Sequence, residues 1–106
     1  MLKLDLEYVQ KILFIRLEGT ITRRYSYKIN NYIVPVIKKH DIKNIVFNLE
    51  KVKGIDESGV DAILNVKCTI KRNEGKIYLC NVNNEILSKI KRLHIKIISS
   101  EETLLN

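Results

Sequence analysis

The amino-terminal part of the chain alternates between apolar and polar side chains. Leucines at positions 2, 4 and 6 alternate with Lys3, Asp5 and Glu7, and a second apolar and polar run covers residues 12–18 before Gly19. A period of two is typical of a strand that buries one face and exposes the other. The pattern predicts two adjacent strands joined near residues 9–11.

After residue 22 the apolar positions follow the period of a helix. They are Tyr25, Ile29, Ile33, Val36 and Ile37. This stripe predicts an amphipathic helix with most of its basic residues on the other side. Pro35 lies inside the stripe and has no N–H for the carbonyl of Asn31, so we expect a kink there or a break into two shorter helices.

The rest of the chain alternates between short apolar runs and helical stripes. Strands are expected at residues 44–49, 76–80 and 95–98, and helices from Ser58 to a stop at residues 73–75 and from Asn83 or Asn84 to about His94. A last helical turn follows Ser99 or Ser100. The order β-β-α-β-α-β-α-β-α predicts a single α/β domain over residues 1–106, with a mixed β-sheet covered by α-helices. Right-handed crossovers would make the strands after the third locally parallel.

Composition places this domain among ordinary globular proteins. A chain of 106 residues that is 45% hydrophobic can bury one core. Its first residues lack the apolar run of a signal peptide or membrane span, so we expect a cytoplasmic protein. Cys68 and Cys80 show no metal-ligand spacing, and both are interpreted as reduced thiols in or near the core. No metal or cofactor is expected.

The chain is basic, with a net charge of +7 and a pI near 9.5. Such a balance favours acidic partners, nucleic acid or an anionic membrane surface. The lysines are scattered among apolar residues, however. A general abundance of Lys, Ile and Asn in the chain explains the positive charge equally well. A nucleic-acid-binding module would also need aromatic residues interleaved on a basic face, whereas Tyr25 and Tyr32 fit helix packing. We therefore expect no direct contact with nucleic acid.

The stretch most suited to carry function is residues 48–62, a polar, glycine-bearing segment between a buried strand and a helix. Local chemistry allows either Asp56 or Ser58 to cap this helix, with Glu57 and Asp61 complementing the positive end of its dipole. No Ser/His/Asp or Cys/His set can be proposed from adjacent predicted elements. His40 and His94 each fall near a predicted helix carboxyl terminus. The protein is accordingly not expected to be an enzyme.

Three segments together carry a family resemblance. They are Ile-Arg-Leu-Glu-Gly at 15–19, Asp-Ile-Lys-Asn-Ile-Val-Phe-Asn-Leu-Glu at 41–50, and Asp-Glu-Ser-Gly at 56–59. The chain resembles a STAS domain, specifically a bacterial anti-sigma factor antagonist of the sporulation type, in which Asp-x-Ser-Gly precedes an apolar helix. The segment 75–82 also resembles the strand that follows in this family.

The resemblance implies a phosphorylation switch at Ser58. In the family, the unphosphorylated antagonist binds an anti-sigma factor that is a serine kinase and releases a sigma factor. Phosphorylation of the serine ends this binding, and a serine phosphatase restores it. The resemblance assigns partner contacts to Asp56 and Gly59, and we expect Glu57, Asp61 and Thr22 to join them. The protein is expected to be a monomer or weak dimer.

Thr22 departs from the family pattern, which has an aspartate in the loop after the second strand. An alternative is therefore a STAS scaffold or adaptor subunit, in a stress-signalling or lipid-transport complex. In that alternative Ser58 is a helix cap that is never phosphorylated.

Overall fold

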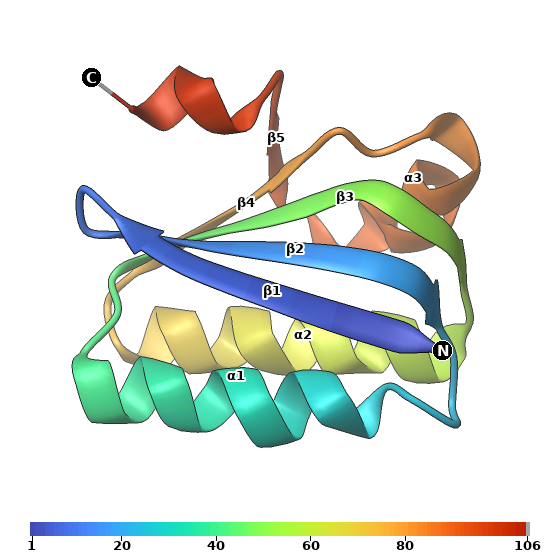
Figure 1. The fold of residues 1–106 in the computed structure, drawn as a ribbon, viewed down its shortest axis with the longest axis horizontal. Helices are drawn as coiled ribbons and strands as arrows, with labels where there is room; N and C mark the ends of the chain where they lie inside the picture. Colours follow the sequence, from blue (N-terminus) through green and yellow to red (C-terminus); the bar gives the residue numbers. More distant parts are fainter. Residues whose placement is uncertain (106) are drawn as a thin grey trace.

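Five strands form one mixed sheet, with two long helices across one of its faces (Figure 1). The computed structural model describes residues 1–105. Its elements are β1 (Leu2–Val9), β2 (Ile12–Ile21), α1 (Tyr27–His40), β3 (Asn44–Ile55), α2 (Glu57–Arg72), β4 (Lys76–Cys80), α3 (Asn84–Ile90), the 3₁₀ helix η1 (Lys91–Leu93), β5 (Lys96–Ile98) and the 3₁₀ helix η2 (Glu101–Leu104). The strand order is β1-β2-β3-β4-β5, with β1 antiparallel to β2 and all other pairs parallel. The predicted α/β fold with a mixed sheet is confirmed.

The first two strands are adjacent and joined near residues 9–11, as the alternation predicts, and the junction is a two-residue hairpin. Gln10 and Lys11 both have positive φ, 51° and 65°. Two consecutive left-handed residues are the geometry of a type I′ turn, whose twist matches that of the flanking strands. The turn fixes the register in which Val9 faces Ile12.

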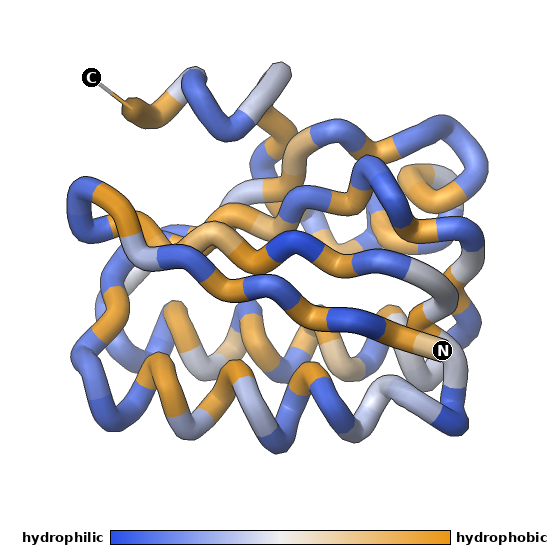
Figure 2. The backbone as a smooth tube through the Cα atoms, viewed as in Figure 1, coloured by the Kyte–Doolittle hydropathy of each residue, from blue (hydrophilic) through white to orange (hydrophobic). Residues whose placement is uncertain are grey.

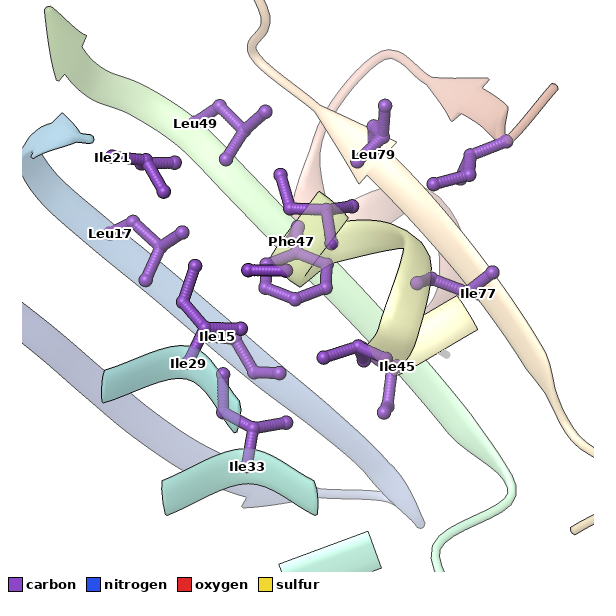
Figure 3. Close-up of a cluster of buried hydrophobic side chains, with 14 of the residues drawn as sticks. Ile15, Leu17, Ile21, Ile29, Ile33, Ile45, Phe47, Leu49, Ile77 and Leu79 are labelled. Atoms are coloured by element: carbon purple, nitrogen blue, oxygen red, sulfur yellow. The ribbon is translucent and has the colours of Figure 1, made fainter. Parts of the chain in front are cut away.

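The main core lies between the sheet and the helices α1 and α2 (Figure 3). The fully buried side chains at its centre include Ile15, Leu17 and Ile21 of β2, Ile45, Phe47 and Leu49 of β3, and Ile29 and Ile33 of α1. Hydrophobic and hydrophilic residues alternate along β1 (Figure 2). The hydrophobic residues of α1 lie on the side of the helix that faces the sheet (Figure 2). Each such side chain contributes about 1.5–3 kcal/mol when it leaves water, so this interface is the main source of stability.

The helix that contains Pro35 is not divided. α1 runs without interruption from Tyr27 to His40 with Pro35 inside it, so of the two expectations the break into two helices is wrong, and the kink stays a prediction. Pro35 and Asn31 both lie on the exposed face of α1. Water can therefore satisfy the Asn31 carbonyl that a proline leaves without an N–H partner.

The strand β3 is twice as long as its apolar run predicts. It continues through residues 50–55 and pairs with the end of β2 across two register shifts. Val52 and Ile55 on this extension are buried, which explains why it forms a strand although its other residues are polar. The predicted loop is thereby reduced to Asp56, the one residue between β3 and α2.

The carboxyl-terminal segment crosses to the face of the sheet opposite α1 and α2. It forms the short 3₁₀ helix η2 instead of the expected α-helical turn. Leu104 and Leu105 pack there on a second cluster of buried residues, Ile12, Phe14, Val46, Cys80 and Ile98. Cys68 and Cys80 are both free thiols, as predicted, and burial raises the pKa of the Cys80 thiol to about 11.

A charged cluster holds η2 on this face. Glu101 accepts from Nε and Nη2 of Arg16 at 2.9 and 2.8 Å and from Nδ2 of Asn48 at 2.7 Å. Asp5 and Glu7 of β1 also lie 3.1 and 2.8 Å from the same guanidinium. The bond from Arg16, followed by that from Asn48, lowers the pKa of Glu101. Two-point binding of a carboxylate by arginine is the stronger and more directional form of ion pair.

We expect the Glu101→Gln variant to lose about 1–2 kcal/mol of stability at pH 7, because charge-assisted hydrogen bonds are lost. The folded pKa of Glu101 lies below its unfolded value near 4.5. Its stabilisation is therefore complete above that value and is lost as the pH falls through the folded pKa. Urea unfolding at pH 7, 5 and 3 should show the difference between parent and variant shrinking toward pH 3. Glu102→Gln, at an exposed neighbouring position, is the control, and a pH-independent difference would contradict the assignment.

Candidate functional site

The candidate site lies where β2 and β3 end and α2 begins (Figure 1). Ile21 and Ile55, the last residues of the two parallel strands, are paired in register. The N–H of Asp56 then donates to the carbonyl of Ile21 at 3.2 Å. Because parallel strands end at the same edge of a sheet, this pairing brings the loop after β2, which begins at Thr22, next to the start of α2.

The Asp56 carboxylate joins these two segments. Its Oδ1 accepts from the N–H of Gly59 at 3.0 Å, and its Oδ2 accepts from the N–H of Arg23 at 2.9 Å. Asp56 is the N-cap of α2, with extended backbone at φ −112° and ψ −175°. The bonds from Gly59 and then Arg23 lower the pKa of Asp56. Of the two residues that local sequence allows as the cap, the structure selects Asp56.

Ser58 is consequently free of a capping role. It is the second residue of α2 and is half-buried, and its hydroxyl makes no hydrogen bond within residues 1–105. A hydroxyl at this position lies beside the unpaired N–H groups of the first helical turn. A change at this hydroxyl therefore breaks no hydrogen bond within residues 1–105.

The other predicted site residues surround this turn with different degrees of exposure. Glu57 and Asp61 are exposed and Thr22 is half-buried. The Thr22 carbonyl accepts from the N–H groups of Tyr25 and Ser26 at 2.9 and 2.8 Å, which orders the loop before α1. The structure therefore gathers Thr22, Asp56 and Ser58 at one end of the sheet.

Basic residues also reach this end, and the sequence patterns did not identify them. Arg92 of η1 binds Glu57 with an Nη2 to Oε2 distance of 2.9 Å, and Lys89 of α3 donates to the Ile55 carbonyl at 3.4 Å. Arg92 is distant in sequence, and only the packing of α3 against β3 brings it here. The exposed pair of Arg92 and Glu57 contributes little to stability.

Gly59 has a packing role. It is buried, and a Cβ at this residue would lie 2.1 Å from the Ile21 carbonyl oxygen and 2.7 Å from Cγ1 of Ile55. The first turn of α2 thus lies directly against the end of β2. Only glycine permits this approach without a shift of the backbone.

Within residues 1–105, no group of three His, Cys, Asp or Glu side chains is placed to hold a metal ion. None of the helices in this part of the chain is long and apolar enough to cross a membrane.

We expect Asp56→Ala to lower the free energy of unfolding by about 1–2 kcal/mol, the usual effect of removing a helix cap. Ser58→Ala should change it by less than about 0.5 kcal/mol, because no hydrogen bond is lost. Urea unfolding of the two variants and the parent at pH 7 measures both effects. Equal destabilisation would mean that Ser58 shares the capping role.

Gly59→Ala should destabilise by about 2–3 kcal/mol or more, since a backbone carbonyl has to move to admit the methyl group. Gly54→Ala is the matched control, because its Cβ would meet only Cγ2 of Thr20 at 3.8 Å. Thermal and urea unfolding should therefore place Gly54→Ala within about 1 kcal/mol of the parent. A Gly59→Ala variant as stable as the control would refute the packing role.

Comparison with known proteins agrees with this architecture. Among solved structures, the unphosphorylated form of the anti-sigma factor antagonist SpoIIAA is 22% identical, with 95% of this chain and 92% of that chain covered and a TM-score of 0.79. The phosphorylated form of Bacillus SpoIIAA is 21% identical, with 95% and 94% covered and the same TM-score of 0.79. RsbS S58E from Moorella thermoacetica is 8% identical, with 94% and 89% covered and a TM-score of 0.80.

At these identities the solved structures establish the fold. A family model described as the STAS domain matches residues 3–104, nearly the whole length that the structure describes. The chain therefore belongs to the STAS domain family.

Proposed function

We propose that the protein is an anti-sigma factor antagonist whose switch is Ser58. In the unphosphorylated form it binds an anti-sigma factor serine kinase in the cytoplasm, and the sigma factor is released. Phosphorylation of Ser58 ends this binding and a serine phosphatase restores it. The observation that carries the proposal is the half-buried Ser58 hydroxyl, which has no hydrogen-bond partner within residues 1–105 while Asp56 caps the helix.

A phosphate at Ser58 is compatible with the fold. It adds a charge of about −1.5 to −2 at a helix amino terminus, where free N–H groups and the helix dipole favour anions. The cap at Asp56 need not break, because its two hydrogen bonds come from Gly59 and Arg23. In support, SpoIIAA in its unphosphorylated and its phosphorylated form matches this chain with the same TM-score of 0.79.

The modification acts on the surface that the partner meets. Glu57, paired with Arg92, and Asp61 are exposed beside Ser58, so a phosphate adds bulk and negative charge beside two existing carboxylates. A kinase surface complementary to the unmodified turn then loses affinity through local repulsion. No conformational change has to travel through the domain.

The proposed contact surface consists of Thr22, Asp56, Glu57 and Asp61 around Ser58. Gly59 belongs to it indirectly, because it is buried and sets how closely the first turn of α2 approaches β2. Thr22, where the family has an aspartate, removes one carboxylate from this surface and is proposed to influence which kinase is bound. The phosphoryl transfer itself is carried out by the partner.

Incubation with a candidate anti-sigma factor kinase and ATP should add one phosphate, measured by intact-mass spectrometry, and Ser58→Ala should abolish it. Ser88→Ala, at an exposed serine of α3, is the control and should still be phosphorylated. The phosphorylated protein and the Ser58→Asp variant should bind the kinase at least about tenfold more weakly, a change of about 1.4 kcal/mol. Binding of the phosphorylated form as tight as that of the parent would overturn the switch. A kinase that binds the protein but never modifies it would favour the adaptor alternative.

A further inference from the structure

A second candidate surface lies at the opposite end of α2 from Ser58. It is a groove of about 340 Å³ between the last turns of α2, the start of β4 and the segment that leads into β5. The residues that line it include five basic side chains and no aspartate or glutamate. The basic residues are Lys67, Lys71, Lys76, His94 and Lys96.

Most of this positive charge is uncompensated. Lys71, Lys76 and Lys96 are exposed, and their ammonium groups have no ion-pair or hydrogen-bond partner within residues 1–105. Lys67 differs, since its Nζ donates to the Leu93 carbonyl and so holds one wall of the groove. Glu74, in the turn before β4, does not line the groove. Like charges that converge without counter-charges favour an anionic occupant.

The groove lies at the edge of β4. β4 pairs with β3 from Lys76 onward but with β5 only from Tyr78 onward. His94 and Ile95, which lead into β5, line the groove without belonging to a strand. Ile77 and Ile95, each 8% exposed, are buried residues beneath it.

We propose that this groove binds an acidic segment of a protein partner in extended conformation. Such a segment can place its carboxylates toward Lys71, Lys76 and Lys96, whose charges have no counter-charge within the described residues.

The shape of the groove favours a peptide over other anions. Phosphate sites usually have converging N–H groups of a helix amino terminus or a glycine-rich loop. Here α2 contributes its carboxyl-terminal turns, which carry the negative end of the dipole. A concave site between helix and strand also admits an extended chain more readily than a nucleic acid duplex or a flat membrane.

The groove is independent of the Ser58 surface. From Ser58 to Arg72, α2 spans about 20 Å at 1.5 Å per residue. One partner could therefore occupy both ends, or two partners could bind at the same time. The proposal does not require that Ser58 is phosphorylated.

The test uses the full chain labelled with ¹⁵N and a synthetic eight-residue peptide in which Glu and Val alternate, with both ends blocked. Backbone amide shifts on titration should change at residues 71–78 and 94–97. Lys71→Gln/Lys76→Gln should weaken binding at least about tenfold, because two of the exposed charges at the groove are removed. Lys38→Gln/Lys39→Gln is the matched control, with the same charge change in the last turn of α1, and should weaken binding less than about twofold.

Several results would overturn the proposal. One is an equal loss in the two double variants, which would indicate general charge attraction. Another is equal binding of a peptide with Gln in place of Glu. Shifts in this groove with inorganic phosphate or a DNA duplex, but none with the Glu peptide, would assign a different ligand. The amide spectra of the free variants establish that each is folded, so failure here is distinguishable from failure at Ser58.

Discussion

The carboxylate of Asp56 binds two N–H groups from different segments, and the arrangement of the candidate site depends on it. One oxygen caps α2 through Gly59, and the other holds the loop after β2 through Arg23. Together with the bond from the Asp56 N–H to the Ile21 carbonyl, these contacts fix the helix, the strand end and the loop relative to one another. They also account for the division of roles between Asp56 and Ser58. Asp56 holds the helix and the loop together, whereas the Ser58 hydroxyl has no hydrogen-bond partner within residues 1–105.

Sequence periodicity was sufficient for the elements that bury one regular face. The alternation in β1 and β2 and the helical stripe of α2 each led to the observed element within a few residues. It was not sufficient for the end of β3, because Glu50, Lys51 and Lys53 resemble a loop while Val52 and Ile55 are buried by distant residues. The absence of a break at Pro35 has a related reason, since the effect of a proline depends on whether the carbonyl of Asn31 faces solvent.

Some residues of the candidate site can be predicted from a local motif, and others only from the tertiary packing. Asp56 and Ser58 stand in a short motif and could be found from sequence. The selection between them as the cap required the backbone geometry. Arg92 could not be found, because only the packing of α3 places it against Glu57. The basic groove could not be found either, as its lysines are separated by up to 29 residues in the chain and converge through the order of the strands.

The single residue between β3 and α2 has a consequence for recognition. Because Asp56 is the only residue between β3 and α2, and because Gly59 packs closely against β2, this end of the molecule has little freedom to move. A rigid surface loses little conformational entropy when a partner docks on it, so more of the contact energy remains as affinity. Such a surface also cannot adapt to an altered side chain by moving away. If a partner docks on this turn, as we propose, small chemical changes at the start of α2 would alter its affinity directly.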